Sequence, residues 1–204
     1  MSCKVLSRSV ELKSTGRTPR SSRAEADTAG EGRERHGSIG PIVSSQHLAA
    51  GLSPGLSELE YGMILVSHAF ERWMVRCMTA AGHPGLSAIE ILILHSIRHR
   101  DRPKTMADIC LVLDISDTHV ANYAIRKLER AGLIRTGRAG KEKTVSIEAE
   151  GRALCDRYAE IREKLLVRGT NEIGPSQEEL SRIASALRLL SGSYDQAARA
   201  AATV

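Results

Sequence analysis

One stretch of this chain constrains its fold more than any other, residues 114–134 with the sequence DISDTHVANYAIRKLERAGLI. Its apolar residues recur at i, i+3, i+4 and i+7, the spacing that places them on one stripe of an α-helix. The stripe consists of Ala121, Ala124, Ile125 and Leu128. Candidate N-caps precede it at Asp114, Ser116 and Asp117. Because Gly132 is a stop signal, we expect a helix over about 117–131.

The face of this helix opposite the apolar stripe carries hydrogen-bonding groups. Hydroxyl, imidazole, amide, phenol and guanidinium side chains all lie there, at Thr118, His119, Asn122, Tyr123, Arg126 and Arg130. Such a face suits the major groove of DNA, because these groups can reach base edges and phosphates together. Taken alone, the stretch is equally typical of a solvated amphipathic helix, so its neighbours in the sequence must decide.

The segment just upstream predicts a second, shorter helix. Residues 104–113 read as a helix capped at Thr105, and only a few residues separate it from the longer helix. Its apolar side chains at Ile109, Val112 and Leu113 are spaced to contact the longer helix. Two helices joined by so short a connection indicate a helix-turn-helix.

The segment just downstream predicts a small basic β-hairpin. Residues 134–138 and 142–147 alternate like strands on either side of Ala139-Gly140-Lys141. Short helix, turn, long helix and basic hairpin occur in the order of a winged helix-turn-helix domain. We predict that basic side chains at the end of the long helix and in the hairpin contact phosphates, at Arg130, Arg135, Arg138, Lys141 and Lys143.

The composition is compatible with a nucleic-acid partner and disfavours several other classes of protein. The 204 residues, 42% of them hydrophobic, can bury one core with an appended helical layer, and the net charge of +5 permits a polyanionic partner. Aromatic residues make up only 3%, which disfavours RNA binding by base stacking on an aromatic sheet. No apolar run is long enough for a membrane span, and the N-terminus is too polar for a signal peptide.

The cysteines are scattered along the chain. Cys3, Cys77, Cys110 and Cys155 form no CxxC pair, so zinc ribbons and disulfide frameworks are disfavoured. We expect the last three on helices as small apolar fillers. Such thiols are typical of a reducing cytoplasm, which is the compartment we predict.

Residues 1–41 are rich in Ser, Arg, Gly and Glu and carry few large apolar groups. They cannot bury enough surface to offset the entropy of ordering, so a disordered tail is expected. Its arginines could contact DNA phosphates loosely, or the tail could be dispensable; they are Arg8, Arg17, Arg20 and Arg23. A short helix is expected at 45–50, ended by Gly51 and Pro54.

The first long helix is expected over about 57–81. A capping box of Ser57 and Glu60 would begin it, and Gly82 and Pro84 would end it. Its apolar residues form a seam with steps of three and four, at Leu59, Met63, Val66, Phe70, Trp73 and Cys77. Further apolar residues widen this surface around the helix, so a second subunit is the natural way to cover it.

A buried helix is expected next, between the first long helix and the helix-turn-helix. It begins at a capping box of Ser87 and Glu90 and runs to about His99. The apolar run 91–94 would also suit a buried strand, but the cap and the continuation through Ile97 favour a helix.

Two terminal helices are expected after the hairpin. The first covers about 148–167, with an apolar face at Leu154, Tyr158, Ile161 and Leu165. The second begins at a capping box of Ser176 and Glu179 and frays in its last Ala-rich residues. Its apolar stripe is Leu180, Ile183, Ala184, Leu187, Leu190 and Tyr194. These helices and the first long helix flank the winged domain, which predicts a dimerisation layer.

The ordered set of motifs resembles the MarR family of bacterial transcriptional regulators, which are dimeric winged helix-turn-helix proteins. The resemblance covers roughly 42–200 and depends on Leu86-Ser87, Met106–Ile109, Arg126–Ile134 and Glu150–Leu154. It implies that the helix at 117–131 enters the major groove and that the wing at 135–143 approaches the minor groove. It also implies that the dimer is formed by helices 57–81, 149–167 and 177–197.

This chain departs from the family's pattern in the wing. The family's wing usually carries an Asp-x-Arg that braces an arginine for the minor groove, and residues 137–143, GRAGKEK, lack that aspartate. We therefore expect Arg138, Lys141 and Lys143 to contact phosphates in place of the usual inserted arginine.

Catalytic and metal-binding interpretations have weaker support. No nucleophile elbow, phosphate-binding glycine loop or paired carboxylates indicate an enzyme, and no cofactor is expected. His95 and His99 at i, i+4 could hold a metal together with His83 or Cys110. However, His99 lies at a helix end, where an imidazole simply complements the helix dipole.

Two further alternatives concern regulation and partners. Cys77 has Arg72 and Arg76 near it in sequence and could sense oxidants, although it also continues the apolar seam of a packed helix. A winged helix acting only as a protein-interaction module is disfavoured by the basic wing and by the arginines of the long helix.

The sequence thus predicts a mainly α protein with a small β-hairpin, in which a winged helix-turn-helix domain adjoins a helical dimerisation layer. The predicted divisions are a tail, an arm with a dimerisation helix, the DNA-binding domain and C-terminal dimerisation helices, at 1–41, 42–81, 82–148 and 149–204. We expect a cytoplasmic homodimeric repressor or activator, responsive to a ligand or stress, that binds near-palindromic double-stranded DNA. An effector pocket is expected at Trp73, Cys77, His95 and Tyr158, unless these side chains only fill the core.

Overall fold

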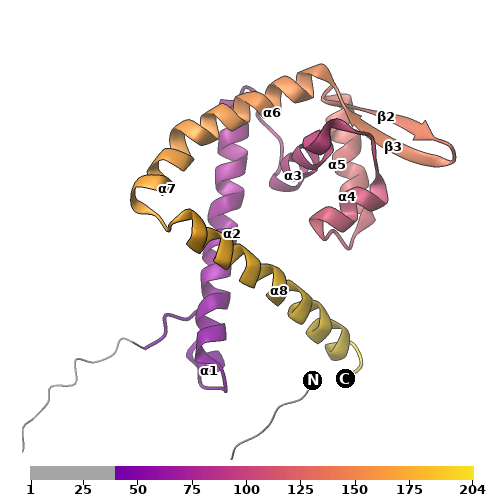
Figure 1. The fold of residues 1–204 in the computed structure, drawn as a ribbon. Helices are drawn as coiled ribbons and strands as arrows, with labels where there is room; N and C mark the ends of the chain where they lie inside the picture. Colours follow the sequence, from indigo (N-terminus) through magenta and orange to yellow (C-terminus); the bar gives the residue numbers. More distant parts are fainter. Residues whose placement is uncertain (1–39) are drawn as a thin grey trace, which may run out of the picture. The chain divides into compact units, whose positions relative to one another are not determined.

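The computed structural model describes residues 40–204, so almost all of the predicted disordered tail, including its arginines, lies outside the described part. The longer helices are α2 (Pro54–Ala80), α3 (Ala88–Arg98), α4 (Met106–Leu113), α5 (Thr118–Arg130), α6 (Ala149–Arg162) and α8 (Gln177–Ala201). The shorter ones are α1 (Gln46–Ala49), α7 (Arg168–Ile173), the 3-10 turn η1 (His99–Asp101) and the π-helical turn η2 (Glu163–Val167). An antiparallel sheet has the order β1-β3-β2, with β1 (Lys104–Thr105), β2 (Ile134–Ala139) and β3 (Glu142–Ile147) (Figure 1). The predicted fold class is confirmed.

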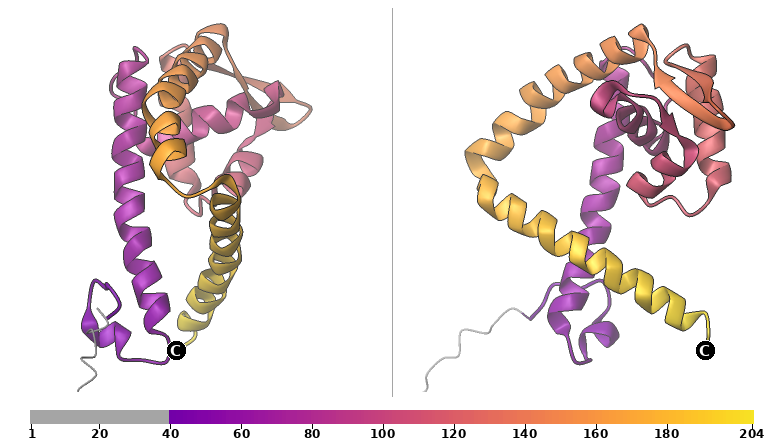
Figure 2. Two further views of the ribbon diagram at one scale, coloured as in Figure 1. Left: turned by 60° about the vertical axis from the view of Figure 1, so that its left-hand side comes forward. Right: turned by 45° about the vertical axis from the view of Figure 1, so that its right-hand side comes forward.

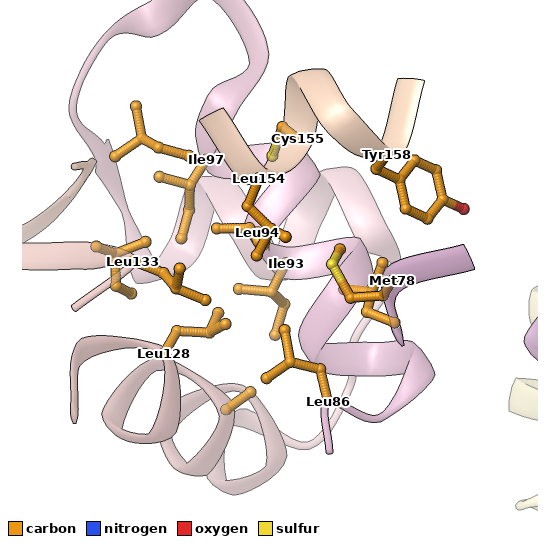
Figure 3. Close-up of a cluster of buried hydrophobic side chains, with 14 of the residues drawn as sticks. Met78, Leu86, Ile93, Leu94, Ile97, Leu128, Leu133, Leu154, Cys155 and Tyr158 are labelled. Atoms are coloured by element: carbon orange, nitrogen blue, oxygen red, sulfur yellow. The ribbon is translucent and has the colours of Figure 1, made fainter. Parts of the chain in front are cut away.

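The core is built around α3. Its apolar run is completely buried at Ile91, Ile93, Leu94 and Ile97. Figure 3 shows side chains of the neighbouring helices around this run, among them Met78, Leu128 and Leu154. The predicted capping box forms, with Ser87 N donating to Glu90 Oε2 at 2.7 Å. A helix forms here because the cap satisfies its first amides and because neighbouring elements cover it on several sides.

α5 matches the predicted amphipathic helix at both ends and along its buried stripe. The carboxylate of Asp117 caps it by accepting a hydrogen bond from His119 N at 2.8 Å. The stripe is at most 1% exposed at Ala121, Ala124, Ile125 and Leu128. At the other end, Leu133 N donates to the carbonyl oxygen of Leu128, and Gly132 takes the positive φ of 71° that such an ending requires.

α4 confirms the predicted short helix, with one correction on its packing face. Thr105 and Asp108 form a reciprocal capping box, with hydrogen bonds of 3.1 Å and 2.9 Å. Val112, which the spacing predicted to contact α5, is instead 68% exposed. At 100° per residue, the buried side of α4 is centred near Leu113, and Val112 lies outside that arc.

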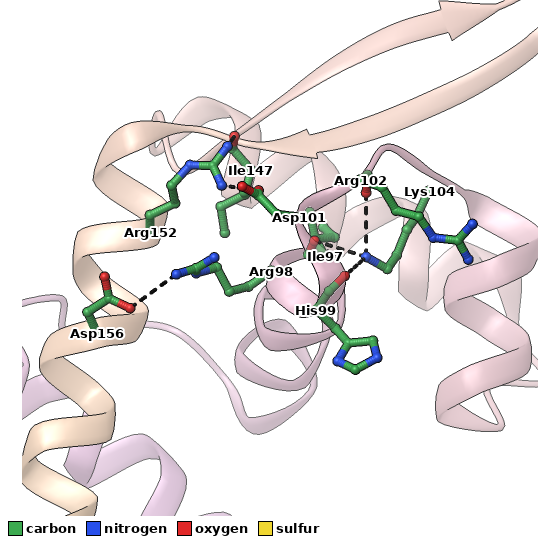
Figure 4. Close-up of polar contacts among 9 residues, drawn as sticks. All are labelled: Ile97, Arg98, His99, Asp101, Arg102, Lys104, Ile147, Arg152 and Asp156. Carbon is green, nitrogen blue, oxygen red and sulfur yellow. Dashed lines mark hydrogen bonds and ion pairs between the residues drawn. The ribbon is translucent and has the colours of Figure 1, made fainter.

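Thr105 caps α4 as predicted, but the strand before the helix was not predicted: Lys104 and Thr105 pair with β3 as strand β1. Lys104 is only 6% exposed. Its Nζ donates to the carbonyl oxygens of Ile97 at 3.1 Å, of Arg102 at 3.5 Å and of His99 (Figure 4). Lys104 therefore supplies both hydrogen bonds and a positive charge to the C-terminal end of α3.

The hairpin forms with the predicted strands and turn. β2 and β3 pair from Ile134 opposite Ile147 at the base to Ala139 opposite Glu142 at the tip. Gly140 takes φ of 62° at the first loop position, a conformation that suits a tight hairpin loop and that glycine adopts without strain. β1 pairs only with Thr144 and Val145 in the middle of β3, so the outer part of the hairpin is two-stranded.

α2 begins earlier than predicted. It starts at Pro54, whose fixed φ and missing N–H suit a first helical turn, with Ser53 as N-cap residue. The predicted capping box of Ser57 and Glu60 does not begin the helix. Ser57 lies inside it, nearly buried, and its hydroxyl donates to the carbonyl oxygen of Leu48 in α1 at 2.9 Å.

The terminal helices extend beyond their predicted ends. α6 continues through η2 into α7, and there Leu165, predicted to lie on the same apolar face as Leu154, is 62% exposed. Leu165 lies inside the π-helical turn, which interrupts the α-helical spacing that would align it with Leu154. α8 runs to Ala201 instead of fraying, because alanine is the strongest helix former. Figure 2 shows that α6 and α7 lead away from the sheet and that α8 doubles back past α2.

Candidate nucleic-acid interface

α5 presents the predicted DNA-facing side chains together on one side of the helix. Its buried stripe fixes the rotation of the helix against the core, which turns the polar face outward. That face is exposed at Thr118, His119, Tyr123, Arg126 and Arg130 and half-buried at Asn122.

Most of these side chains have hydrogen-bonding capacity left over. Within residues 40–204, the side chains of His119, Tyr123 and Arg126 make no hydrogen bond or ion pair. Asn122 Nδ2 donates to the carbonyl oxygen of Thr118 at 3.0 Å, which leaves the amide oxygen of Asn122 as an available acceptor. The face can therefore offer donors and acceptors to a partner without breaking the core.

The wing gathers positive charge around a polar hollow of about 510 Å³. The hollow is lined by Thr136, Gly137, Arg138, Lys141 and Lys143. Arg138 and Lys143 are directly opposite each other in the β2–β3 ladder. Like charges in that position repel, and no carboxylate pairs with either of them within the described residues. An anion in the hollow would relieve this repulsion.

Arg135 is placed differently from the other basic residues of the wing. Its Nε lies 3.0 Å from Glu148 Oε1 at the base of the hairpin. The guanidinium is well exposed, yet it already has a carboxylate partner. The structure therefore does not bring Arg135 to the hollow, and its predicted contact with phosphate stays a prediction.

Two features of this surface have no counterpart in the sequence prediction. Val120 is 43% exposed beside the polar face of α5, where an apolar group can contact a thymine methyl. Its position off the buried stripe was the available signal. Glu129 accepts hydrogen bonds from Thr136 in β2, and no sequence pattern indicates such a contact between a helix and a strand.

Lys127 fixes α5 to the start of α3. Its Nζ lies 2.8 Å from Glu90 Oε2 and 2.7 Å from the carbonyl oxygen of Gly85. Glu90 is only 3% exposed, and the same carboxylate completes the α3 capping box. Removing the charge of Lys127 would leave the buried carboxylate of Glu90 without its ion-pair partner, so this contact holds the polar face of α5 in a fixed orientation.

A second pocket, of about 510 Å³, lies between α2, α3 and α6. Trp73, His95 and Tyr158 line it, as the sequence predicted, and so do Arg98 and Asp156. The rings of His95 and Tyr158 meet edge to face with 4.6 Å between centroids. His95 Nε2 is buried without a hydrogen-bond partner, and burial lowers the pKa of His95, so its ring is mostly neutral at pH 7.

The prediction that Cys77 lines this pocket is wrong. Cys77 is 2% exposed and packs beneath α6, with its Sγ donating to the carbonyl oxygen of Tyr158 at 3.6 Å. Cys155 lines the pocket instead. Burial raises the pKa of Cys77, and it raises the pKa of Cys155 to about 11. Both thiols are therefore protonated at neutral pH, which does not favour the thiol-sensing alternative.

Residues 40–204 contain no group of three or more His, Cys, Asp or Glu side chains placed to hold a metal ion. Within the same residues, no helix combines the length and apolar character that crossing a membrane requires.

Known proteins share both the domain and the fold described above. Residues 86–151, from just before α3 to the first turn of α6, match the family model of a winged helix DNA-binding domain. A MarR-family transcriptional regulator from Rhodococcus sp. RHA1 has a TM-score of 0.55 and 15% sequence identity, covering 69% of this chain and 94% of that chain. The chain has the fold of MarR-family regulators.

Two further structures support the MarR-like fold. A cysteine variant of MarR from E. coli, in complex with operator DNA, has a TM-score of 0.56 and 15% identity, covering 69% of this chain and 98% of that chain. The transcriptional regulator MosR of M. tuberculosis has a TM-score of 0.52 and 16% identity, covering 65% of this chain and 94% of that chain. No curated protein matches the sequence. The domain match and the MarR-like fold together support a DNA-binding regulator.

Proposed function

We propose that the chain is a sequence-specific DNA-binding transcription regulator that acts as a homodimer and carries out no covalent chemistry. The observation that carries the proposal is α5, a helix held by a fully buried stripe and offering unpaired polar groups on its outer side. Arg126 suits guanine and Asn122 suits adenine in the major groove, and a good contact of this kind is worth about 1–3 kcal/mol.

The wing supplies positioning on the DNA backbone in this proposal. Arg138, Lys141 and Lys143 surround a hollow in which a phosphate would relieve the repulsion between opposing cations. Phosphate contacts fix register and orientation but carry no sequence information directly. The basic wing and the free arginine of α5 favour DNA over a purely protein-binding role.

The homodimer is proposed from apolar surface that one copy of the chain leaves uncovered. Large apolar side chains are exposed on α2 and α8, at Leu56, Leu59, Ile64, Leu65, Val66, Phe70, Ile183, Leu187 and Leu189. Large apolar side chains exposed in such number on two helices favour an interaction surface, and a second copy related by a two-fold axis would cover it. Two α5 helices would then face DNA, so the operator should be a near-palindrome with half-sites about one helical turn apart.

A small-molecule effector is proposed to occupy the pocket between α2, α3 and α6. The pocket combines apolar walls with the polar groups of His95, Arg98 and Tyr158, a combination typical of ligand sites. An effector can release DNA only if it binds better to a form whose α5 helices do not match the half-site spacing. The scattered cysteines support a reducing cytoplasm as the compartment where this occurs.

Selection from a random library of duplexes tests the central proposal. The full chain is bound to the library, bound duplexes are recovered and sequenced over several rounds, and the enriched site is tested by titration. A near-palindromic site that binds much more tightly than random duplex is the expected result. Binding that stays equal across sequences and weakens steeply with salt would restrict the chain to phosphate contacts and overturn sequence specificity.

A further inference from the structure

The base of the wing is held from both sides by groups outside the hairpin. In register across the sheet, Lys104 of β1 lies opposite Val145 of β3, and Val145 lies opposite Thr136 of β2. Beyond β2 the row continues to Glu129 of α5, whose Oε1 accepts from Thr136 N at 3.0 Å and from Thr136 Oγ1 at 2.6 Å. On the other side, Lys104 is fixed to the carbonyl oxygens at the end of α3.

This row matters because the hairpin beyond it is only two-stranded. β2 is an edge strand, and its outward N–H at Thr136 would otherwise need water or another partner. A two-stranded hairpin by itself is marginally stable, so the direction of its tip depends on how its base is held. Arg138 and Lys143 project just beyond the row, and Lys141 lies at the tip.

The carboxylate of Glu129 suits this role electrostatically. The two hydrogen bonds from Thr136 lower the pKa of Glu129, and nearby Lys143 acts in the same direction. Glu129 is therefore ionised at neutral pH, and a charged acceptor forms the stronger hydrogen bond. Its negative charge also lies close to a surface that would meet phosphates, where charge alone would oppose binding.

We propose that Glu129 is a positioning residue that fixes the wing to α5, so that the cations of the wing and the polar face of α5 reach one DNA duplex together. This inference rests on the proposed function and adds to it the element that joins its two DNA-contacting surfaces. The wing of this chain has no aspartate to hold its arginine. Glu129 would instead hold the wing from α5.

Replacing Glu129 should change DNA affinity in opposite directions depending on whether the residue acts as a brace or only as a negative charge. Removing a carboxylate near DNA raises affinity if only its charge counts, whereas removing a brace lowers affinity. E129A should bind both the selected site and random duplex on the order of tenfold more weakly, with the log–log salt slope reduced by about 0.9 for each phosphate that the wing no longer reaches. E129Q retains an oxygen that accepts from Thr136 and should stay within about threefold of the wild type.

E142A is the matched control, because Glu142 carries the same charge in the wing and its side chain has no hydrogen bond or ion pair within the described residues. It should bind DNA as tightly as the wild type or more tightly. Thr136→Val tests the same contact from the other side, because valine suits a strand and removes only the hydroxyl donor. It should show a smaller decrease in affinity than E129A, in the same direction.

Several results would overturn the brace. E129A binding as tightly as E142A would leave only a charge effect. Equally weakened binding in E129A and E129Q would show that the hydrogen-bond acceptor at position 129 is not required. Weaker binding of E129A at an unchanged salt slope would mean that the wing had not moved. Hydrogen exchange at the Thr136 amide, slow in wild type and E129Q and fast in E129A, tests the contact without DNA. A wild type that binds no duplex overturns the proposed function as well, which distinguishes the two failures.

Discussion

Arg98 Nη2 of α3 lies 3.4 Å from Asp156 Oδ1 of α6, and both residues line the pocket between α2, α3 and α6. Figure 4 shows a second contact beside it, between Arg152 of α6 and Asp101 of η1. The end of α3 is thus joined to α6 at the point where the chain turns into β1 and the helix-turn-helix.

The ion pair of Arg98 and Asp156 contributes little energy, but it lies at the wall of the pocket and at the end of α3. The two side chains are 36% and 63% exposed, and pairs of that kind contribute about 0–1 kcal/mol. A contact so weak can be opened or reinforced by a molecule in the pocket that touches either partner. Arg98 thus lines the pocket and also ends α3, directly before the turn that leads to β1 and the helix-turn-helix.

Lys104 should make a much larger contribution to stability than an exposed lysine. Lys104→Ala removes the donor to the carbonyl oxygens at the end of α3, and we expect the free energy of unfolding to fall by about 2–4 kcal/mol. Urea denaturation followed by circular dichroism measures this. Lys141→Ala, an exposed control in the wing turn, should change it by less than about 0.5 kcal/mol. A decrease in Lys104→Ala as small as in the control would mean that those carbonyl groups find other donors.

His95 should make stability depend on pH in the weakly acidic range. Burial lowers its pKa in the folded chain below the ordinary value of 6.5, so the unfolded chain takes up the proton first. The stability that neutral His95 contributes is therefore complete above about pH 6.5 and is lost as the pH falls toward the folded pKa. His95→Phe keeps a ring beside Tyr158 and cannot titrate. Its unfolding free energy should fall less than that of the wild type between about pH 7.5 and pH 5, and parallel curves would contradict this.

Arg126 and Arg130 should differ in how they affect DNA binding. Arg126→Ala should weaken binding to the selected site by about 1–3 kcal/mol and random duplex much less, because Arg126 is proposed to read a base. Arg130→Ala should weaken both alike and reduce the log–log salt slope by about 0.9, because Arg130 is proposed to contact phosphate. Fluorescence anisotropy at several salt concentrations measures both. Equally weakened binding to both duplexes for Arg126→Ala would make it a phosphate contact.

The parts of the fold that local pattern specifies could be predicted from the sequence. In α5 the apolar stripe, the Asp117 cap and the Gly132 stop lie in one continuous stretch, and all of them act within the helix or at its ends. The capping box of Ser87 and Glu90 is equally local. At the start of α2 two local signals competed, and Ser53 followed by Pro54 prevailed over Ser57, because proline fixes the first turn.

The contacts that join different elements could not be predicted in this way. Periodicity placed Cys77 on an apolar face but could not say that the backbone of α6 covers it, so the pocket was assigned one wrong residue. Nothing in the sequence around Lys104 indicates that its side chain reaches the end of α3. The hydrogen bonds between Glu129 and Thr136 likewise depend on how the hairpin packs against α5.

The dimer should depend on the exposed apolar surface of α2. An obligate interface of this kind usually leaves no stable folded monomer, so sedimentation velocity should detect dimer at the lowest measurable concentration. Val66→Asp, at a position 60% exposed on α2, should give monomer or unfolded chain. Leu111→Asp is the matched control, because Leu111 is 83% exposed but lies on α4. A dimer that survives Val66→Asp as well as Leu111→Asp would place the interface elsewhere.

The effector pocket can be tested directly because Trp73 is the chain's single tryptophan and lines it. A small-molecule library is screened for compounds that release the selected DNA site, and each active compound is titrated while tryptophan fluorescence is recorded. A compound bound in the pocket should change that fluorescence at the concentrations that release DNA, because it contacts the indole. Trp73→Ala should then need on the order of tenfold more compound for half-release, since a large aromatic wall of the site is missing. Ile173→Ala, an exposed apolar position on α7 outside the proposed dimer surface, serves as the control and should keep wild-type potency. If release occurs without a change in fluorescence and with equal potency in Trp73→Ala, the compound binds elsewhere, and the indole of Trp73 only fills the space between α2 and its neighbours.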